Sequence, residues 1–406
     1  MIKYLKKEKV LSIALILAIW SAFLVHPDQQ YIDYIDLRVL ALLFCLMLIV
    51  KGFQDIGLFA VLVRKVFGYI KNTRSLAMVM MLACFLFSML ITNDVALITF
   101  VPFAIMALHL CHQERLMIRV VVLQTLAANL GSMLTPIGSP QNLYLYSVSG
   151  MGIGHFVLTI LPIWVVSFVM LIGGTMVTIP KEQIVVSLKV EKHTEQPVLK
   201  LRKNMEADGN LQASACATSP EDDDVWLSNI GKMNRVHLFV YFGLFIINLL
   251  VVLRVLHWAP AMAITVVGVL LLRKWQLLKQ VDYALLLTFV GFFIFVGNVG
   301  RIELVSQLIA NLLVGREILI SAVFSQFLSN VPAALLLSGF TQNLEGLLVG
   351  CNIGGLGTLI ASMASLISYK FYANESCADK RKYIRTFTLA NIVMFVVLLV
   401  FSLLVY

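Results

Sequence analysis

The sequence predicts an all-α polytopic membrane protein, and three observations lead to this fold class. First, 60% of the 406 residues are hydrophobic and only 13% are charged, which leaves too little polar surface to cover a water-soluble domain. Second, apolar runs about long enough to cross a membrane as helices recur along the chain. Third, polar breaks recur in matching pairs within such runs, which predicts an inverted repeat with two re-entrant helical hairpins and two broken transmembrane helices.

The distribution of basic residues predicts the orientation of the chain. Lys and Arg cluster in "KYLKKEK", "RKVFGYIKNTR", "RKWQLLK" and "KRKYIR", each beside an apolar run, as the positive-inside rule requires of cytoplasmic flanks. This placement accounts for the net charge of +9 without a nucleic-acid partner. We therefore expect a multi-pass protein of the plasma membrane, surrounded by lipid, with a cytoplasmic N-terminus and a retained first helix.

The apolar and polar segments predict an ordered series of units. They are an N-terminal helix at 1–34, repeat 1 at 35–179, a cytoplasmic linker at 180–235, a two-helix connector at 236–280 and repeat 2 at 281–406. The linker lacks apolar periodicity and reads as disordered. In each repeat an expected span and an amphipathic stretch precede a hairpin, at 76–110 or 318–340, and a broken helix, at 120–146 or 347–369.

The two hairpins share a polar tip. The first contains "FSMLITNDVALITF" from Phe87, and the second contains "FSQFLSNVPAALLL" from Phe324. Aligning these two phenylalanines also pairs Ser88 with Ser325, Thr92 with Ser329 and Asn93 with Asn330. Clusters of basic residues flank the first hairpin at both ends, and no such cluster flanks the second, so the two should enter the membrane from opposite sides.

The two broken helices align in the same way. "NLGSMLTPIGSPQNL" from Asn129 pairs without gaps with "NIGGLGTLIASMASL" from Asn352. Prolines break the first helix and glycines permit the second to unwind. Irregular backbone at membrane depth must be buried in protein or line a wet cavity, where free carbonyls can ligate Na⁺ and helix N-termini can bind an anion. The residues expected to support these breaks are Asn129, Gly131, Thr135, Pro136, Pro140, Asn142, Asn352, Gly354, Gly357 and Thr358.

Each polar residue also has a structural interpretation. A single Asn or Ser in a membrane helix usually joins it to a neighbouring helix, which is the favoured reading of Asn129 and Asn352 taken alone. Recurrence of the same spacing favours a functional role for Asn93 and Asn330. Asp94 is an intramembrane carboxylate, a residue type that is costly and by default functional, although it could instead close the hairpin tip as a hydrogen-bond acceptor.

At these positions the chain resembles the ion transporter superfamily, in the branch that holds divalent anion:sodium symporters, citrate permeases, arsenite-efflux permeases and related Na⁺/H⁺ antiporters. The resemblance covers nearly the whole chain and is specific at the two tips and the two broken helices. Symporters of this branch carry Ser-Asn-Thr at both tips. Here the tips read Thr92-Asn93-Asp94 and Ser329-Asn330-Val331.

The resemblance implies roles for individual residues. One Na⁺ site would use Ser88, Asn93 and Gly138, with Asp94 beside it, and the other Ser325, Asn330 and Ala361. The substrate would meet the tip residues Thr92, Asn93, Asp94, Ser329 and Asn330, together with Ser139 and Ser362. Members of this superfamily are typically homodimers whose binding domain moves past a fixed scaffold like an elevator.

We therefore expect a secondary transporter for a small anion or oxyanion such as a carboxylate, coupled to Na⁺ or H⁺. An ionised Asp94 would repel a dicarboxylate, so this residue could instead bind a cation or carry a proton. A Na⁺/H⁺ antiporter and an arsenite-type efflux permease, the latter with Cys351 near the second broken helix, remain the alternatives. The chain has no HExxH motif, no second carboxylate to pair with Asp94 and no phosphate-binding loop, which argues against an enzyme and against any cofactor beyond the coupling ion.

Overall fold

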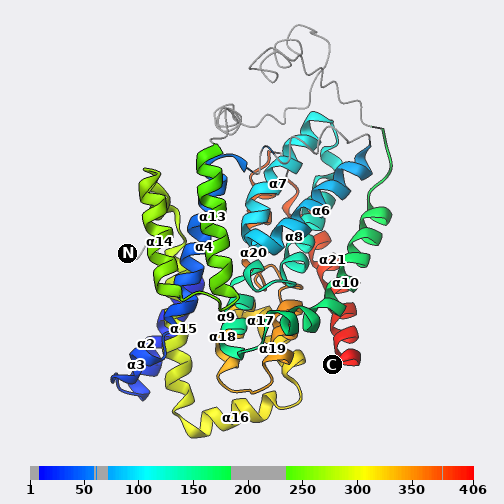
Figure 1. Cartoon of the computed structure of the whole chain (residues 1–406). Coiled ribbons are helices and arrows are strands. Elements are labelled where there is room, and N and C mark those ends of the chain that lie inside the picture. Colours follow the sequence, from blue (N-terminus) through cyan, green and yellow to red (C-terminus); the bar gives the residue numbers. More distant parts are fainter. Residues whose placement is uncertain (1–8, 59–60, 62–71, 184–234, 377) are drawn as a thin grey trace.

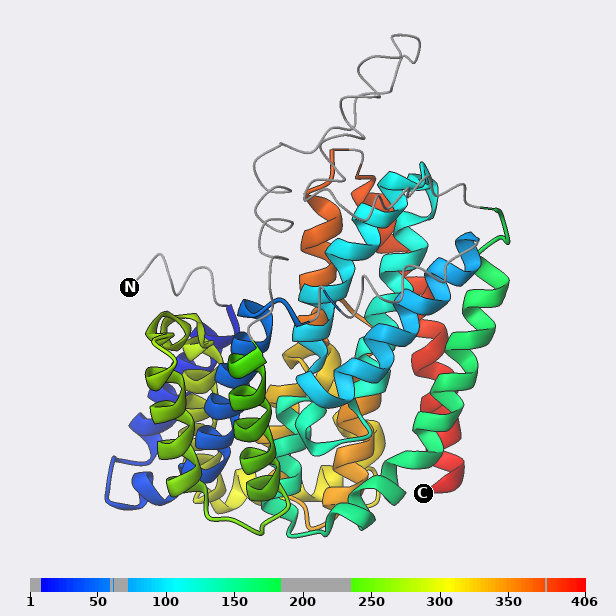
Figure 2. The same ribbon diagram turned by 45° about the horizontal axis from the view of Figure 1, so that its top comes forward.

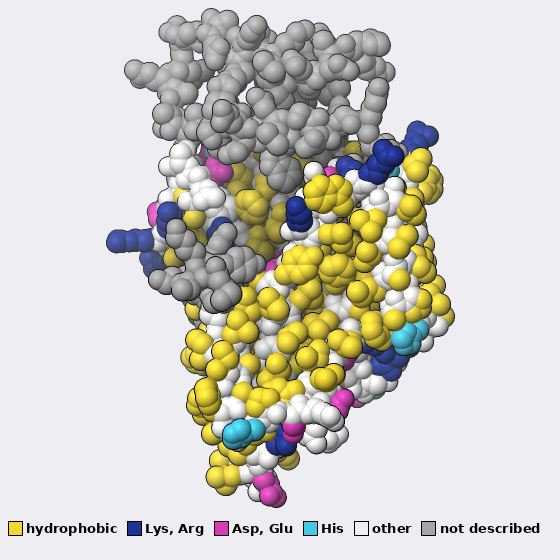
Figure 3. Space-filling model, turned by 90° about the vertical axis from the view of Figure 1, so that its left-hand side faces the viewer, with side chains coloured by type: hydrophobic (Ala, Val, Ile, Leu, Met, Phe, Trp, Pro, Cys, Tyr) yellow, Lys and Arg dark blue, Asp and Glu magenta, His cyan; other side chains and the backbone are white. Residues whose placement is uncertain are grey.

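The computed structural model describes residues 9–58, 61, 72–183, 235–376 and 378–406, and the described part consists of helices joined by short connections. Six of the described helices are long and apolar enough to cross a membrane: Leu37–Asp55, Thr73–Ile91, Ile153–Thr178, Arg235–Val252, Tyr283–Gly300 and Lys380–Val405. Figure 3 shows hydrophobic side chains covering the middle of one face, with charged residues and histidines near its ends. The all-α polytopic fold class is thus confirmed.

The helices form two groups that lie side by side (Figures 1 and 2). The scaffold group contains α2 (Lys9–Leu24), α4 (Leu37–Asp55), α13 (Arg235–Val252), α14 (Trp258–Leu271) and α15 (Tyr283–Gly300). Its outward faces are rich in exposed apolar side chains, such as Phe23 at 78% and Phe239 at 74% exposure, as lipid contact requires. The short helix α3 (Gln30–Asp33) follows α2, and the 3₁₀ helix η3 (Trp275–Gln280) precedes α15.

The second group, which we call the hairpin bundle, contains the two hairpins and the two broken helices. They are α6 (Thr73–Ile91) with α7 (Asn93–Leu110), α8 (Met117–Ser132) with α9 (Pro140–Ser149), α17 (Glu317–Leu328) with α18 (Asn330–Ser338), and α19 (Leu344–Gly354) with α20 (Met363–Ala373). Two short 3₁₀ helices, η1 (Glu114–Leu116) and η2 (Pro136–Gly138), lie in the connections of the first half. In Figure 1 the first hairpin occupies the upper half of the bundle and the second the lower half.

Two long helices and one amphipathic helix complete the arrangement. Helices α10 (Ile153–Thr178) and α21 (Lys380–Val405) each follow a broken helix and pack against each other. Helix α21 begins at Lys380, before the apolar run expected from Thr386, because Asp379 caps it by accepting the Lys382 N–H at 2.9 Å. Helix α16 (Glu303–Leu313) is the amphipathic stretch expected in repeat 2, and it meets α17 at 111°.

Two expected segments lie mostly outside the described residues. The cytoplasmic linker at 180–235 is described only at its ends. The amphipathic stretch of repeat 1, which follows α4, is described only in part. Neither prediction is tested further.

Candidate substrate and ion site

The two hairpin tips have the same backbone conformation. Thr92, between α6 and α7, has φ 74° and ψ 150°, and Ser329, between α17 and α18, has φ 78° and ψ 156°. This region of backbone space is otherwise almost restricted to glycine. At both tips the following asparagine then accepts a hydrogen bond on its side-chain oxygen from the next backbone N–H, at 3.0 Å. The matching sequence positions therefore fold into matching local structures.

Each tip is attached to the broken helix that follows it through a threonine hydroxyl. The Thr135 hydroxyl donates to the Met89 carbonyl in repeat 1. The Thr358 hydroxyl donates to the Gln326 carbonyl, at 3.1 Å, in repeat 2. Both carbonyls belong to the last turn of the helix that leads into the tip, where backbone oxygens lack partners within the helix.

Glycines allow the helices of each repeat to approach closely. A Cβ atom on Gly131 of α8 would lie 2.0 Å from the Phe85 carbonyl oxygen and 2.6 Å from the Ser88 hydroxyl of α6. A Cβ atom on Gly354 of α19 would lie 2.6 Å from Ser325 of α17. Only glycine fits at either contact, so the recurrence of these glycines reflects the same helix crossing in both halves.

The broken helices of the two repeats bond to each other at the centre of the bundle. The Asn129 amide donates to the Ser365 hydroxyl at 3.4 Å, and the Asn352 amide donates to the Asn142 side-chain oxygen at 2.7 Å. The two bonds are equivalent, since aligning Asn129 with Asn352 also pairs Asn142 with Ser365. Asn129 and Asn352 therefore each join helices of opposite repeats.

Asn129 also forms hydrogen bonds with the first hairpin tip and with the second broken helix. Its side-chain oxygen accepts from the Asn93 amide at 3.1 Å and from the Ser362 hydroxyl at 3.0 Å. All three residues are at most 6% exposed. Expected substrate residues of both repeats thus meet in one buried network.

Four helices begin at this network without a side-chain cap. Helices α4, α6, α15, α19 and α21 have Asp or Asn caps that each accept a backbone N–H at 2.8–3.0 Å. The four helices at the site, α7, α9, α18 and α20, make no hydrogen bond from the side chain of the residue that precedes them, and the same is true of α8, α10, α16 and α17. The N-termini of α7, α9 and α20 offer N–H groups and positive dipole ends, which bind anions. Helix α18 does not, because its first two N–H groups are already donated to oxygens of Ala361 and Asn330 and its third residue is a proline.

Two buried oxygens at the site have no hydrogen-bond partner among the described residues. They are Oδ1 of Asp94, at the start of α7, and the Ser139 hydroxyl, which directly precedes α9. Ser139 is 1% exposed. Because buried polar groups are normally satisfied, these two oxygens are the clearest places for a ligand to complete the network.

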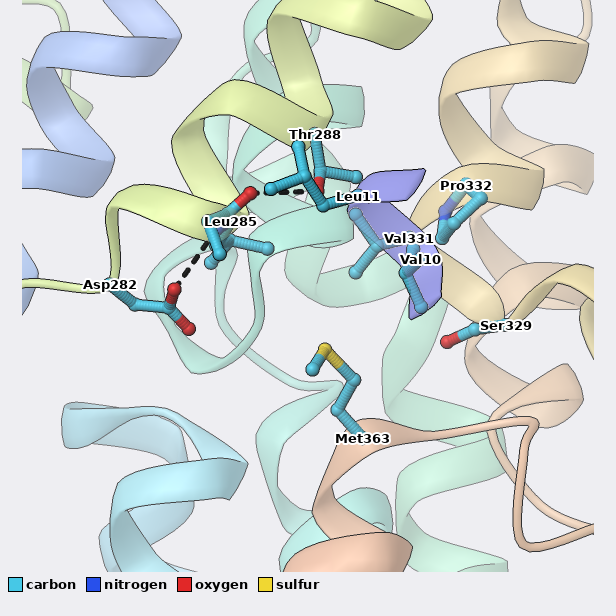
Figure 4. Close-up of a pocket in the computed structure, with 10 residues that line it drawn as sticks. Val10, Leu11, Asp282, Leu285, Thr288, Ser329, Val331, Pro332 and Met363 are labelled. Atoms are coloured by element: carbon cyan, nitrogen blue, oxygen red, sulfur yellow. Dashed lines mark hydrogen bonds between the residues drawn. The ribbon is translucent and has the colours of Figure 1, made fainter. Parts of the chain in front are cut away.

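The tip of hairpin 2 faces the scaffold group across a cleft. Ser329, Val331 and Met363 line one side, and Val10, Leu285 and Thr288 line the other (Figure 4). The Asp282 carboxylate lies at the same cleft and caps α15 by accepting the Leu285 N–H at 3.0 Å. The site therefore borders the boundary between the two helix groups.

Comparison with known proteins identifies the family. The family model described as Citrate transporter matches residues 5–345. The chain belongs to the citrate transporter family. It is 30% identical over 358 residues to the Inner membrane protein YbiR of Escherichia coli (strain K12), covering 87% of this chain and 85% of that protein. It is 25% identical over 350 residues to the Uncharacterized transporter MJ0456 of Methanocaldococcus jannaschii, covering 86% and 84% respectively.

Membership of the citrate transporter family confirms the resemblance inferred from the tips. The protein is an integral multi-pass membrane transporter and not an enzyme. The family does not specify the coupling ion or the individual substrate of this chain, so both are inferred below from the geometry of the site.

The structure brings Asn93, Asn129 and Ser362 into one hydrogen-bonded network and adds two polar residues that the sequence pattern did not single out. Thr358 lies toward the surface, where its side chain is exposed. Ser365 was missed although it stands opposite Asn142 in the aligned broken helices. Gln326 was also missed, and its signal was a polar side chain next to Ser325 in an otherwise apolar run. Cys351, on α19, is fully buried.

Proposed function

We propose that this citrate-transporter family member is a secondary active transporter that moves a small anion or oxyanion, such as a carboxylate, coupled to Na⁺ or H⁺. The observation that carries the proposal is the meeting of three helix N-termini without a side-chain cap, those of α7, α9 and α20, beside the buried network of Asn93, Asn129 and Ser362. Helix N-termini complement an anion, and the uncapped carbonyls of the helices that end there complement a cation.

The orientation and assembly follow from the same proposal. The basic flanks support a cytoplasmic N-terminus, and the cleft beside Ser329 supports alternating access by movement of the hairpin bundle along the scaffold group. A homodimer built through the scaffold group would leave the bundle free to move. The substrate residues would be Thr92, Asn93, Asp94, Ser139, Ser329, Asn330 and Ser362.

Uptake by purified protein in liposomes tests the proposal. A panel of carboxylates, sulfate and arsenite, each with and without a Na⁺ or pH gradient, should yield one class of anion whose uptake requires a gradient. Asn93→Ala and Asn330→Ala should each lower that uptake more than about tenfold, because each removes a hydrogen-bonding group from a desolvated anion site.

Asn248→Ala is the matched control. Asn248 is a buried asparagine of α13, where its amide donates to Leu244 and Thr265, and its replacement should leave uptake per folded protein unchanged. Full uptake in both tip variants would refute the proposal.

Asp94 supports a second candidate, a cation/proton antiporter of the same fold. Its unpaired buried oxygen could carry a proton or ligate a cation directly. Asp94→Asn should abolish antiport measured by a pH-sensitive dye inside the liposomes, whereas an anion carrier should retain part of its uptake.

A further inference from the structure

The second hairpin is fastened to its own broken helix by a glutamine that has no counterpart in the first. The Gln326 amide nitrogen donates to the carbonyls of Gly354 and Leu356, both at 2.9 Å. Its side-chain oxygen accepts from the Thr358 N–H at 3.0 Å. One side chain thus satisfies two carbonyls that the unwound segment after α19 frees, and it ties them to α17.

The Ala361 carbonyl, expected to ligate the second cation, also accepts a hydrogen bond from the protein. The Asn330 N–H donates to the Ala361 carbonyl at 2.9 Å. The Asn330 side-chain oxygen accepts both from the Val331 N–H at 3.0 Å and from the Ser329 hydroxyl at 3.3 Å. At the tip of repeat 2, these two expected cation ligands therefore already accept hydrogen bonds from the protein.

Repeat 1 lacks both of these attachments. Met89 occupies the position of Gln326 and has no donor to offer the unwound segment. The Asn93 N–H and the Gly138 carbonyl do not bond to each other, whereas their equivalents in repeat 2 do. Asn142 does donate to carbonyls of this segment, at 3.2–3.3 Å, but it lies on α9 and so does not tie the segment to hairpin 1.

The first tip also differs in charge. Asp94 stands where repeat 2 has Val331, and its Oδ1 is buried without a partner among the described residues. Hard monovalent and divalent cations are bound by carboxylate, amide and backbone oxygens. The asparagine side-chain oxygen accepts the next backbone N–H at both tips, so the repeats differ at two other oxygens. Repeat 1 has the unpartnered Asp94 Oδ1, whereas in repeat 2 the Asn330 N–H already occupies the Ala361 carbonyl.

We infer that the transporter binds a single coupling cation, in repeat 1, at Asn93, Asp94 and Gly138. In repeat 2 the Gln326 amide takes the place of a second cation, since it bridges the hairpin and the unwound segment without an ion. This inference rests on the proposed function and narrows it to one cation per transport cycle. The cation is either a sodium ion held by these oxygens or a proton held by the Asp94 carboxylate.

Cation-dependent thermal unfolding of the detergent-purified full chain tests the inference without any transported substrate. A ligand that binds only the folded state raises the melting temperature, and the concentration dependence reports the number of sites. Sodium chloride is titrated against choline chloride at constant ionic strength, and a pH series is run in choline chloride. We expect a response that fits one site, whether the ion proves to be sodium or a proton.

Variants at the two hairpin tips show which repeat binds the cation. Asn93→Ala and Asp94→Asn should abolish the cation-induced rise in melting temperature, and Asn330→Ala should retain it. A two-site response in the native protein would overturn the inference, as would equal loss in Asn93→Ala and Asn330→Ala. So would the absence of any sodium or proton effect. These outcomes concern cation binding in the melting experiment. The proposed transport function is tested separately, by anion uptake into liposomes.

Gln326→Met gives an independent test, because it reproduces the Met89 of repeat 1. It should lower the melting temperature in choline chloride and show a larger sodium response than the native protein, since the freed carbonyls can then accept an ion. Gln307→Met, on the exposed face of α16 where Gln307 bonds only Glu303 among the described residues, is the control. An unchanged sodium response in Gln326→Met would contradict the assignment.

Discussion

Thr92 and Ser329, at the two hairpin tips, have strained backbone conformations. Both are non-glycine residues with positive φ and extended ψ, a conformation that costs on the order of 1–3 kcal/mol at each residue. Other non-glycine residues with positive φ, such as Arg254 and Arg273, follow helix ends. Both residues carry a hydroxyl, as the substrate roles proposed for Thr92 and Ser329 require.

At this scale, Thr92→Gly should relieve strain. We expect its free energy of unfolding to rise by about 1 kcal/mol, because glycine adopts positive φ without steric cost. Thr99→Gly in the interior of α7 is the control and should lower it by about 1 kcal/mol. Thermal unfolding in detergent micelles measures both, and equal losses would show that Thr92 is not strained.

Close helix crossings organise the site at the scale of elements. Helices α6 and α8 approach at Gly131, and α17 and α19 approach at Gly354. Helix association within a bilayer depends on such small residues, because lipid removes the hydrophobic driving force between helices. The crossings place Asn129 and Asn352 one turn before the breaks, where each reaches the opposite repeat.

Gly131→Ala should therefore lower stability by about 1–3 kcal/mol, since the new methyl group would meet a backbone carbonyl that cannot move aside. Gly173→Ala is the matched control, because nothing lies within 4 Å of its Cβ position on α10. The control should be neutral or slightly stabilising. Similar melting temperatures for the two variants would contradict the close crossing of α6 and α8.

At the scale of the whole molecule, the hairpin bundle meets the scaffold group along a limited boundary. Helix α15 packs against α18, and α4 packs against α9. The cleft between α15 and the second tip (Figure 4) contains Leu285 on one side and Val331 on the other. A boundary of this kind permits one group to move along the other without unpacking either core.

A cross-link at this boundary should stop the transport cycle. In the Leu285→Cys, Val331→Cys double variant, oxidation with copper phenanthroline should reduce uptake more than about tenfold, and dithiothreitol should restore it. The two single variants control for modification of native cysteines. Undiminished transport by the cross-linked protein would show that the two groups do not move relative to each other at this point.

The sequence predicted where the helices and their breaks lie, but it did not predict which side chains bond to each other. Apolar runs, basic flanks and paired polar breaks predicted the membrane fold, both hairpins and both broken helices. The tips were predicted because Asn93 and Asn330 recur at the same spacing, and spacing is a property of the chain alone.

By itself, the sequence determined the class of protein, the places where its helices break and the residue types available there. Only the tertiary structure decided which groups satisfy each other: that Asn129 bonds Ser365 of the other repeat, and that Gln326 closes the second tip while Asp94 leaves the first one open. The physical reason is that helix breaks follow from local backbone chemistry, whereas the partner of a freed carbonyl depends on which distant helix approaches within hydrogen-bonding distance.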